Sequence, residues 1–331
     1  MSEQEQTSSN GRRLLELFAA VWFMSFNIWG ALIGPIIIVF LIFTSSKFWI
    51  FVVAYLVWIW VLDRNTAAEG GRRCEWMRKW KLWAHFKNYF PVYLKQSVDF
   101  QLQPNKNYLF CAFPHGLLSV GVFSSFVTAS EDFAQLFPKH KPYVFTFDVK
   151  FRLPIYREYL LSMGMCTGTP DSLHSVLGTR KGGNIGVLVV GRPSPENYPR
   201  NYTIVLKNQK GFVKQAIKNG CALVPVIAFG EDDIFRQIDK PKTTFFRPFQ
   251  DFFQIFMGLA PSVFLKNGLL PKRKAIHVIV GPPMEVKRMS RPLQNDVNVV
   301  HREFLVNLVD LFEKHKYDYV DDPENTYLIY C

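Results

Sequence analysis

Residues 108–127 read YLFCAFPHGLLSVGVFSSFV, and this stretch decides which fold the chain can adopt. Its first six residues are aromatic or apolar without interruption, which is typical of a strand buried on both faces of a sheet. Pro114-His115-Gly116 ends this run, and an apolar segment, Leu117 to Val127, follows. We therefore expect a buried strand that ends just before His115, with the histidine at the opening of a helix.

Short apolar runs and helical stretches alternate along the rest of the chain. Pro154 suits the first turn of a helix, and Gly220 stands where a helix would end. This alternation predicts an α/β domain over residues 101–331, built on a sheet whose faces are covered by helices. Further strands are expected at residues 143–147, 186–190, 222–229 and 276–280, and helices at 154–163, 211–219 and 297–316.

An apolar hairpin is expected before this domain, at residues 14–62, after a polar tail at residues 1–13 whose first ten residues are expected to be disordered. No charged residue occurs from Leu17 to Ser46, and after Lys47 residues 48–62 are uncharged as well. A spanning helix needs roughly 20 apolar residues, so the first run suffices and the second is marginal. Gly34-Pro35 predicts a bend within the first run. Two antiparallel spans that turn at residues 44–47, and a re-entrant wedge, both remain open.

Basic residues flank the hairpin on both sides. Arg12 and Arg13 precede it, and Arg64, Arg72 and Arg73 are among those that follow. The positive-inside rule therefore places both flanks in the cytosol. A cleaved signal peptide is excluded, because the apolar run is too long and no cleavage site follows it.

Residues 63–100 form a basic, aromatic segment after the hairpin. Trp76, Trp80, Trp83 and Phe90 recur at near-helical spacing among lysines and arginines. This pattern favours a helix that lies in the lipid headgroup layer. An ordinary helix that faces the protein core is the alternative.

Composition restricts the partners of the chain. The net charge is +12 and the pI is about 9.4, which suits an anionic membrane surface or a phosphorylated cofactor. Nucleic acid is not expected, because no nucleic-acid-binding motif occurs. The 5 cysteines and 7 histidines are scattered, without CxxC or HExxH spacing, so we expect neither a disulfide framework nor a metal site.

His115 is the candidate catalytic base. The carboxyl ends of strands are where α/β proteins usually bind ligands. The partial positive charge of a helix N-terminus disfavours the imidazolium, and a neutral imidazole can accept a proton from an alcohol. A single histidine beside proline and glycine is more often structural, so the residues around it do not by themselves assign it a catalytic role.

Blocks along the whole chain carry a family resemblance. The blocks are Tyr89-Phe90-Pro91, Pro114-His115-Gly116, Arg152-Leu153-Pro154, Arg157-Glu158-Tyr159-Leu160, Lys210-Gly211-Phe212, Ala216, Gly220, Leu223-Val224-Pro225-Val226, Phe229-Gly230-Glu231 and Val280-Gly281-Pro282. On these blocks the sequence resembles the type-2 diacylglycerol acyltransferase family, which includes monoacylglycerol and wax alcohol acyltransferases, from the hairpin to about Lys316.

The resemblance implies transfer of a fatty acyl group from acyl-CoA to the hydroxyl of diacylglycerol, forming triacylglycerol for storage. Monoacylglycerol and long-chain alcohol are the alternative acceptors. Phe113 stands where the family usually has a first histidine, so any base in this motif must be His115. Gln209 and Arg192 also depart from the family pattern, which puts the substrate preference in doubt more than the reaction.

A histidine base needs a carboxylate that orients its ring and stabilises the imidazolium. Ser119, four residues after His115, cannot supply it as in His-x4-Asp acyltransferases. Glu196 matches the acidic position of the family and is the first choice, with a solvated loop glutamate as its alternative. Glu231 is second, with a helix cap or an ion-pair partner as its alternative, and Asp148 is third.

Substrate contacts are expected around these residues. Phe113, Pro114 and Gly116 flank the base, and Gly116 leaves room for a substrate. The phosphates of CoA would favour basic residues near a helix N-terminus, and solvated surface charges are the alternative. The candidates for this role are Arg152, Arg157 and Lys210, and the adjoining Gly211 and Phe212 are further candidate substrate-binding residues.

Other functions are weighed against acyl transfer. A serine lipid hydrolase is excluded, because it needs a G-x-S-x-G elbow that the sequence lacks. A non-enzymatic lipid-droplet scaffold remains as an alternative. We expect an enzyme of the endoplasmic reticulum membrane and the lipid droplet surface, with its catalytic domain facing the cytosol. Its partners would be the bilayer, acyl-CoA and acylglycerol, without a permanently bound cofactor, and homo-oligomerisation is left open.

Overall fold

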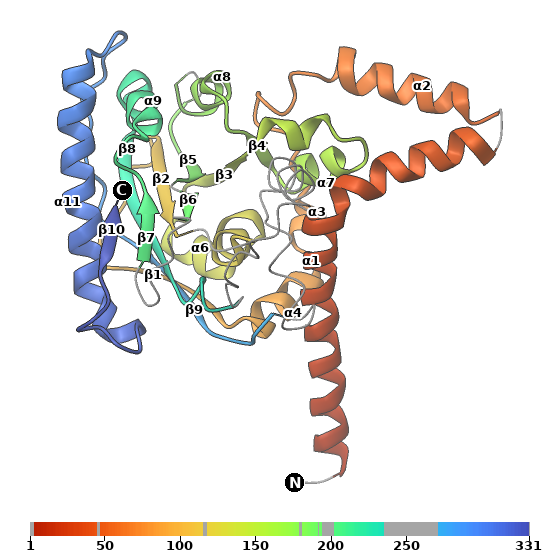
Figure 1. Cartoon of the computed structure of the whole chain (residues 1–331), viewed down its shortest axis with the longest axis horizontal. Coiled ribbons are helices and arrows are strands. Elements are labelled where there is room, and N and C mark those ends of the chain that lie inside the picture. Colours follow the sequence, from red (N-terminus) through yellow and green to blue (C-terminus); the bar gives the residue numbers. More distant parts are fainter. Residues whose placement is uncertain are drawn as a thin grey trace, which may run out of the picture.

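A seven-stranded sheet forms the centre of the computed structural model, which describes residues 3–44, 47–114, 118–178, 181–190, 192–193, 202–234 and 271–330 (Figure 1). The strands lie in the order β1-β9-β8-β2-β5-β3-β4. Their bounds are β1 Val92–Gln96, β2 Tyr108–Phe113, β3 Lys141–Thr146, β4 Met165–Thr167, β5 Asn184–Val189, β8 Ala222–Phe229 and β9 Ile276–Val280.

All neighbouring strands are parallel except β8 and β9, which are antiparallel. β2 lies between β5 and β8, with Ala112 paired to Val189 on one side and Phe113 paired to Ile227 on the other. The carboxyl ends of these three strands therefore meet at one edge of the sheet. The predicted α/β class is confirmed, and strands β2, β8 and β9 have the predicted bounds.

The alternation of side chains along β2 divides the core into two layers. Phe110 and Ala112 pack into one hydrophobic cluster, whereas Leu109, Cys111 and Phe113 pack into the other. Both faces are apolar because helices cover both, which explains the uninterrupted apolar run in the sequence. The first face is covered by α1 Glu3–Thr44, α4 Lys81–Tyr89, α5 Val120–Val122, η2 Phe123–Val127, α6 Glu131–Leu136 and α7 Tyr156–Ser162.

The second face carries α8 Pro170–Leu173, η4 His174–Gly178, α9 Gly211–Asn219 and α11 Gln294–Tyr319. Figure 1 shows α11 and α1 on opposite sides of the sheet. A small second sheet of β10 Leu328–Tyr330, β7 Tyr202–Val205 and β6 Arg192–Pro193 was not predicted. Its strands are too short to give a recognisable period in the sequence.

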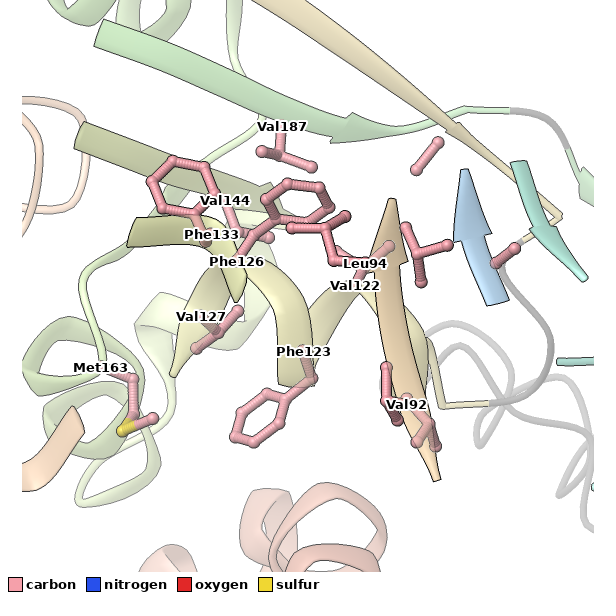
Figure 2. Packing of buried hydrophobic residues seen from close by; sticks show 14 of the residues in the cluster. Val92, Leu94, Val122, Phe123, Phe126, Val127, Phe133, Val144, Met163 and Val187 are labelled. Atoms are coloured by element: carbon pink, nitrogen blue, oxygen red, sulfur yellow. The ribbon is translucent and has the colours of Figure 1, made fainter. Parts of the chain in front are cut away.

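The helix that follows the Pro-His-Gly motif is the centre of the first core layer. It begins as α5 and continues as the π-helical turn η2. Figure 2 shows Phe123 pointing from this helix toward α1, while Phe126 packs among residues of the sheet side. The Phe123 ring lies 4.6 Å from that of Phe23, and the Phe126 ring lies 5.9 Å from that of Phe110. The helix therefore joins the sheet to α1.

The N-terminal hairpin is formed by α1, α2 Trp49–Val57 and the π-helical turn η1 Trp58–Leu62. Among the described residues no single helix is both long and apolar enough to cross a membrane, and the arms Gly11–Asn27 and Trp29–Thr44, bent by 67°, meet this criterion only together and by length and composition alone. The bend thus falls before Trp29, and the prediction of a bend at Gly34-Pro35 is wrong. Gly34 instead serves close packing, because a Cβ there would lie 2.0 Å from the Pro154 carbonyl oxygen.

Two other expectations about the N-terminal part need correction. The predicted polar tail is helical from Glu3, since glutamate and glutamine favour the extension of a helix that is already formed. The predicted headgroup helix is two short helices, α3 Glu75–Arg78 and α4. Trp83 and Phe90 are buried in the core, and Trp76 is 70% exposed, so the core-facing alternative describes most of this segment.

Candidate active site

The predicted catalytic segments follow three neighbouring strands. Pro114 comes directly after β2, the chain leaves β5 toward Glu196, and Glu231 comes two residues after β8. His115, Gly116 and Glu196 lie outside the described residues. Phe113, the last residue of β2, is fully buried, and its ring lies 6.1 Å from that of Phe304 on α11. Phe113 therefore contributes to the core rather than to an open surface.

Glu231 holds the start of the helix that follows the Pro-His-Gly motif. Its side chain is 2% exposed, and its two carboxylate oxygens accept hydrogen bonds from the backbone N–H groups of Val120 and Gly121, at 2.6 and 2.7 Å. These N–H groups have no partner within a helix that begins at Val120. The structure thus places Glu231 as a helix cap, which was the alternative to a catalytic role.

The backbone next to this cap is strained. Ser119 has a φ of +51°, a left-handed conformation that costs a non-glycine residue roughly 1–2 kcal/mol. Gly121 lies so close to the sheet that a Cβ there would be 2.9 Å from both Glu231 Oε2 and Val278 Cγ2. The position of the chain at Ser119, four residues after His115, is therefore fixed by the hydrogen bonds to Glu231, by the strained backbone and by the close packing of Gly121. This arrangement was not predicted from the sequence, because the cap comes from Glu231, 111 residues from Val120 in the chain.

Burial raises the pKa of Glu231 to about 8. The two backbone N–H groups favour the ionised form and lower the pKa, but their effect is smaller than that of burial. The nearby Asp232 carboxylate raises it further. An acid whose pKa is higher in the folded than in the unfolded protein stabilises the fold below the unfolded pKa. That contribution is lost as the pH rises from about 4.5 to about 8.

A Glu231→Gln variant is therefore expected to change the pH dependence of stability. At pH 5 Glu231 is protonated, and both its carbonyl and its hydroxyl oxygen can accept a hydrogen bond, whereas the NH2 group of glutamine cannot, so the variant should be less stable there by about 1–3 kcal/mol. The difference should shrink toward pH 8, because only the wild type loses stability over this range. Melting temperatures between pH 5 and 8 measure this, with Glu131→Gln, an exposed residue on α6, as the control. A constant difference between variant and wild type would contradict the assignment.

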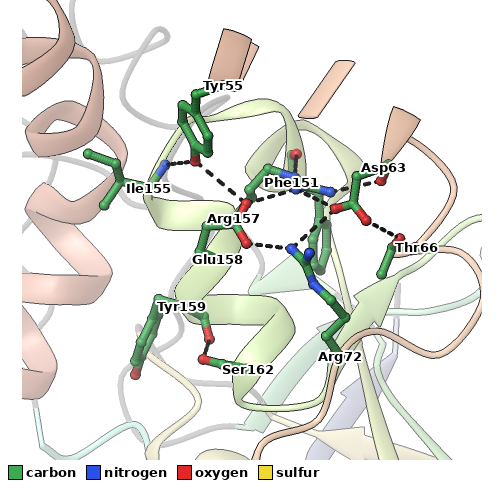
Figure 3. Close-up of polar contacts among 10 residues, drawn as sticks. All are labelled: Tyr55, Asp63, Thr66, Arg72, Phe151, Ile155, Arg157, Glu158, Tyr159 and Ser162. Carbon is green, nitrogen blue, oxygen red and sulfur yellow. Dashed lines mark hydrogen bonds and ion pairs between the residues drawn. The ribbon is translucent and has the colours of Figure 1, made fainter. Parts of the chain in front are cut away.

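Arg157, predicted to bind substrate, lies in the protein interior. Its guanidinium contacts Asp63 Oδ2 at 2.7 Å and Glu158 Oε1 at 2.8 Å, and it donates to the Phe151 carbonyl at 3.2 Å (Figure 3). Only 2% of its side chain is exposed. These contacts give the charge of Arg157 a structural role.

Hydrogen bonds next to the Arg157 ion pairs join the hairpin to the domain. The Tyr55 hydroxyl on α2 accepts a hydrogen bond from the backbone N–H of Ile155 at 2.9 Å, and Trp60 donates to the Arg152 carbonyl at 3.4 Å. Ile155 has a φ of +63°, a strained conformation that the Tyr55 contact helps to hold. Arg152 itself is exposed and paired with Asp148, at 2.7 Å. The Asp148 carboxylate, which follows β3, is therefore engaged by Arg152.

Lys210, Gly211 and Phe212 form the beginning of α9. The Lys210 ammonium donates to Asn298 Oδ1 on α11 at 2.8 Å, Gly211 is exposed, and Phe212 is buried against Phe304 at 5.2 Å between rings. The described residues contain no group of three or more His, Cys, Asp or Glu side chains that could hold a metal.

Comparison with known proteins assigns the class. The family model for diacylglycerol acyltransferase matches residues 40–330, and the chain belongs to this family. The match includes the ends of β2, β5 and β8, where the predicted catalytic segments lie.

Relatives within the family include enzymes named for two different acceptors. Bovine 2-acylglycerol O-acyltransferase 1 is 37% identical over 96% of each chain, and bovine diacylglycerol O-acyltransferase 2 is 35% identical over 89% of this chain and 83% of its own. Human diacylglycerol O-acyltransferase 2-like protein 6 is 38% identical over 92% of this chain and 93% of its own. The solved 1-acyl-sn-glycerophosphate acyltransferase of Thermotoga maritima is similar at a TM-score of 0.41 and 13% identity, covering 90% of this chain and 97% of its own.

Proposed function

We propose that this protein transfers a fatty acyl group from acyl-CoA to the free hydroxyl of diacylglycerol, forming triacylglycerol. The observation that carries the proposal is the family match over residues 40–330, which contains all three central strand ends. Monoacylglycerol is the second candidate acceptor, because the 2-acylglycerol acyltransferase relative aligns over 96% of its length.

His115 is the proposed base. It removes the proton of the acceptor hydroxyl while the oxygen attacks the thioester carbonyl carbon. A carbon–oxygen bond forms, the carbon–sulfur bond breaks, and the proton passes from His115 to the departing CoA thiolate. No covalent acyl-enzyme is required. Its position after the buried strand β2 supports this role, since the strand ends beside the segments that follow β5 and β8.

Glu196 is the proposed partner of His115, and Glu231 is proposed to position the motif. Both Glu231 carboxylate oxygens are engaged by backbone N–H groups, which leaves Glu231 less suited to orient an imidazole ring. Glu196 follows β5, the strand that pairs with β2 on the side opposite β8. The two carboxylates therefore take separate tasks in the proposal.

The membrane setting also belongs to the proposal. Exposed apolar side chains on α1 and α2, among them Phe40, Phe43, Phe51 and Trp49, suit a hairpin in the bilayer of the endoplasmic reticulum or the surface of a lipid droplet. Basic residues on both flanks support a domain that faces the cytosol. An apolar acceptor could then reach the domain from the lipid phase without crossing water.

Acyl transfer to defined acceptors tests the proposed function. Membranes from cells that lack their own acyltransferases, and that produce this protein, are given labelled acyl-CoA with diacylglycerol, monoacylglycerol or long-chain alcohol. We expect labelled triacylglycerol with diacylglycerol as the best acceptor. Faster labelling of monoacylglycerol would select the second candidate. No labelled product with any acceptor would leave a non-enzymatic scaffold as the better interpretation.

A further inference from the structure

A groove of about 620 Å³ lies between α11 and the chain that leads into α9. Its lining includes Lys207, Lys210 and Arg302, with Asp310 as an acidic member and Leu305 as an apolar one. The structure gives none of these three cations a carboxylate partner among the residues it describes. The groove therefore carries excess positive charge in a partly apolar lining.

The N-terminus of α9 opens beside the same groove. No side chain among the described residues caps it, and a Cβ on the exposed Gly211 would meet no atom within 4 Å. The first N–H groups of a helix have no intrahelical partner, and together with the helix dipole they favour an anion. An anion at this position would also lie close to Lys210, the residue that precedes the helix.

A buried histidine in the wall of the groove gives an independent indication of a ligand. His301 on α11 is 4% exposed, and its Nε2 has no hydrogen-bond partner among the described residues. Buried polar atoms are nearly always paired, so Nε2 is expected to meet a ligand atom in the groove.

Ionisation of His301 would respond to such a ligand. Burial lowers the pKa of His301, and the Lys210 charge lowers it further. A bound anion would oppose both effects and favour the imidazolium, which would donate from Nε2. The other charges that line the groove are Lys207, Arg302 and Asp310.

The position of the groove favours a water-soluble ligand that reaches toward the strand ends. α11 and α9 cover the sheet face opposite α1, the helix of the proposed membrane hairpin (Figure 1). Ring contacts also connect the groove to the Pro-His-Gly motif. The Phe212 ring lies 6.1 Å from His301 and 5.2 Å from Phe304, which lies 6.1 Å from Phe113.

We propose that this groove binds a phosphate ester, held by Lys207, Arg302, His301 and the N-terminus of α9. The assignment of the ligand rests on the proposed function: acyl-CoA carries phosphate groups at its nucleotide end, and its long pantetheine arm can extend from there to the catalytic segments. A lipid headgroup has the same phosphate chemistry, but it would approach from the other face of the sheet.

Binding measurements on the full chain in detergent micelles test this site without requiring catalysis. Titration calorimetry with CoA compares the wild type with Lys207→Ala/Arg302→Ala, in which both substituted side chains are exposed, so the fold should persist. We expect the double variant to weaken CoA binding about tenfold. Lys218→Ala removes an exposed charge from the last turn of α9 outside the groove, and it should change binding less than about twofold.

Two further arms identify the ligand. Pantetheine, which has no phosphate, should bind the double variant and the wild type equally. Calorimetry of CoA in buffers of different ionisation heat should show proton uptake that is lost in His301→Gln. Equal CoA affinity in the double variant and the wild type would overturn the site. Weaker binding of dioctanoyl phosphatidate with unchanged CoA binding would replace CoA by a lipid headgroup.

The phosphate site and the proposed function can be overturned independently of each other. A protein that acylates no acceptor but still binds CoA through these charges would keep the phosphate site and lose the reaction. A protein that transfers acyl groups at the same KM for acyl-CoA in the double variant would keep the reaction and lose the site.

Discussion

A His115→Ala variant is expected to transfer acyl groups about 10²–10⁴-fold more slowly than the wild type, because general-base catalysis contributes a factor of this size. Alanine cannot take the hydroxyl proton, and Phe113 leaves no second histidine in the motif. The fall should appear in kcat, since the base acts in the transition state rather than in binding. Single-turnover transfer of labelled acyl groups, with diacylglycerol as acceptor, measures it.

A matched histidine variant separates chemistry from folding. His85 on α4 is half-buried and lies outside the candidate site, so His85→Ala controls for the loss of an imidazole. Both variants should keep the wild-type melting temperature to within a few degrees. A His115→Ala protein that is folded and fully active would show that the base lies elsewhere in the chain.

The fold was predictable where burial alone determines the sequence. β2 and β8 are apolar on both faces, and β9 is apolar except for His277, so these strands were predicted with their observed bounds. α9 was equally clear, because it ends at Gly220, which has a φ of +66°. Features set by contacts between distant segments were not predictable. The bend in α1 and the tight packing of Gly34 on Pro154 depend on how the hairpin meets the domain.

In the candidate site, too, the features set by a local pattern were predictable and those set by contacts between distant segments were not. The position of Pro114-His115-Gly116 after a buried strand follows from the local pattern. The hydrogen bond of Glu231 does not follow from any local pattern, because its carboxylate accepts from the backbone N–H of Val120, 111 residues earlier in the chain. The groove beside α9 was also missed, apart from Lys210, because Lys207, His301 and Arg302 come from two separated segments and form no motif.

Replacing Arg157 with methionine is expected to destabilise the protein strongly. Methionine fills similar volume, but it leaves Asp63 without its closest cation in a site where the Asp63 side chain is only 12% exposed. Removing one member of a buried ion pair typically costs about 3–5 kcal/mol. For a chain of this size, this corresponds to a fall in melting temperature of roughly 10 °C in detergent.

Arg152→Ala is the control for this variant, five residues earlier in the same segment. Its side chain is 74% exposed and pairs with the half-exposed Asp148, so its loss should cost less than about 1 kcal/mol. The double variant Arg157→Met/Asp63→Asn should recover part of the stability, because it no longer leaves a carboxylate with an incomplete set of partners. Equal melting temperatures for Arg157→Met and Arg152→Ala would contradict the structural role of Arg157. Equal values would make Arg157 a candidate for substrate binding again, because a buried cation that does not stabilise the fold would then need a functional explanation.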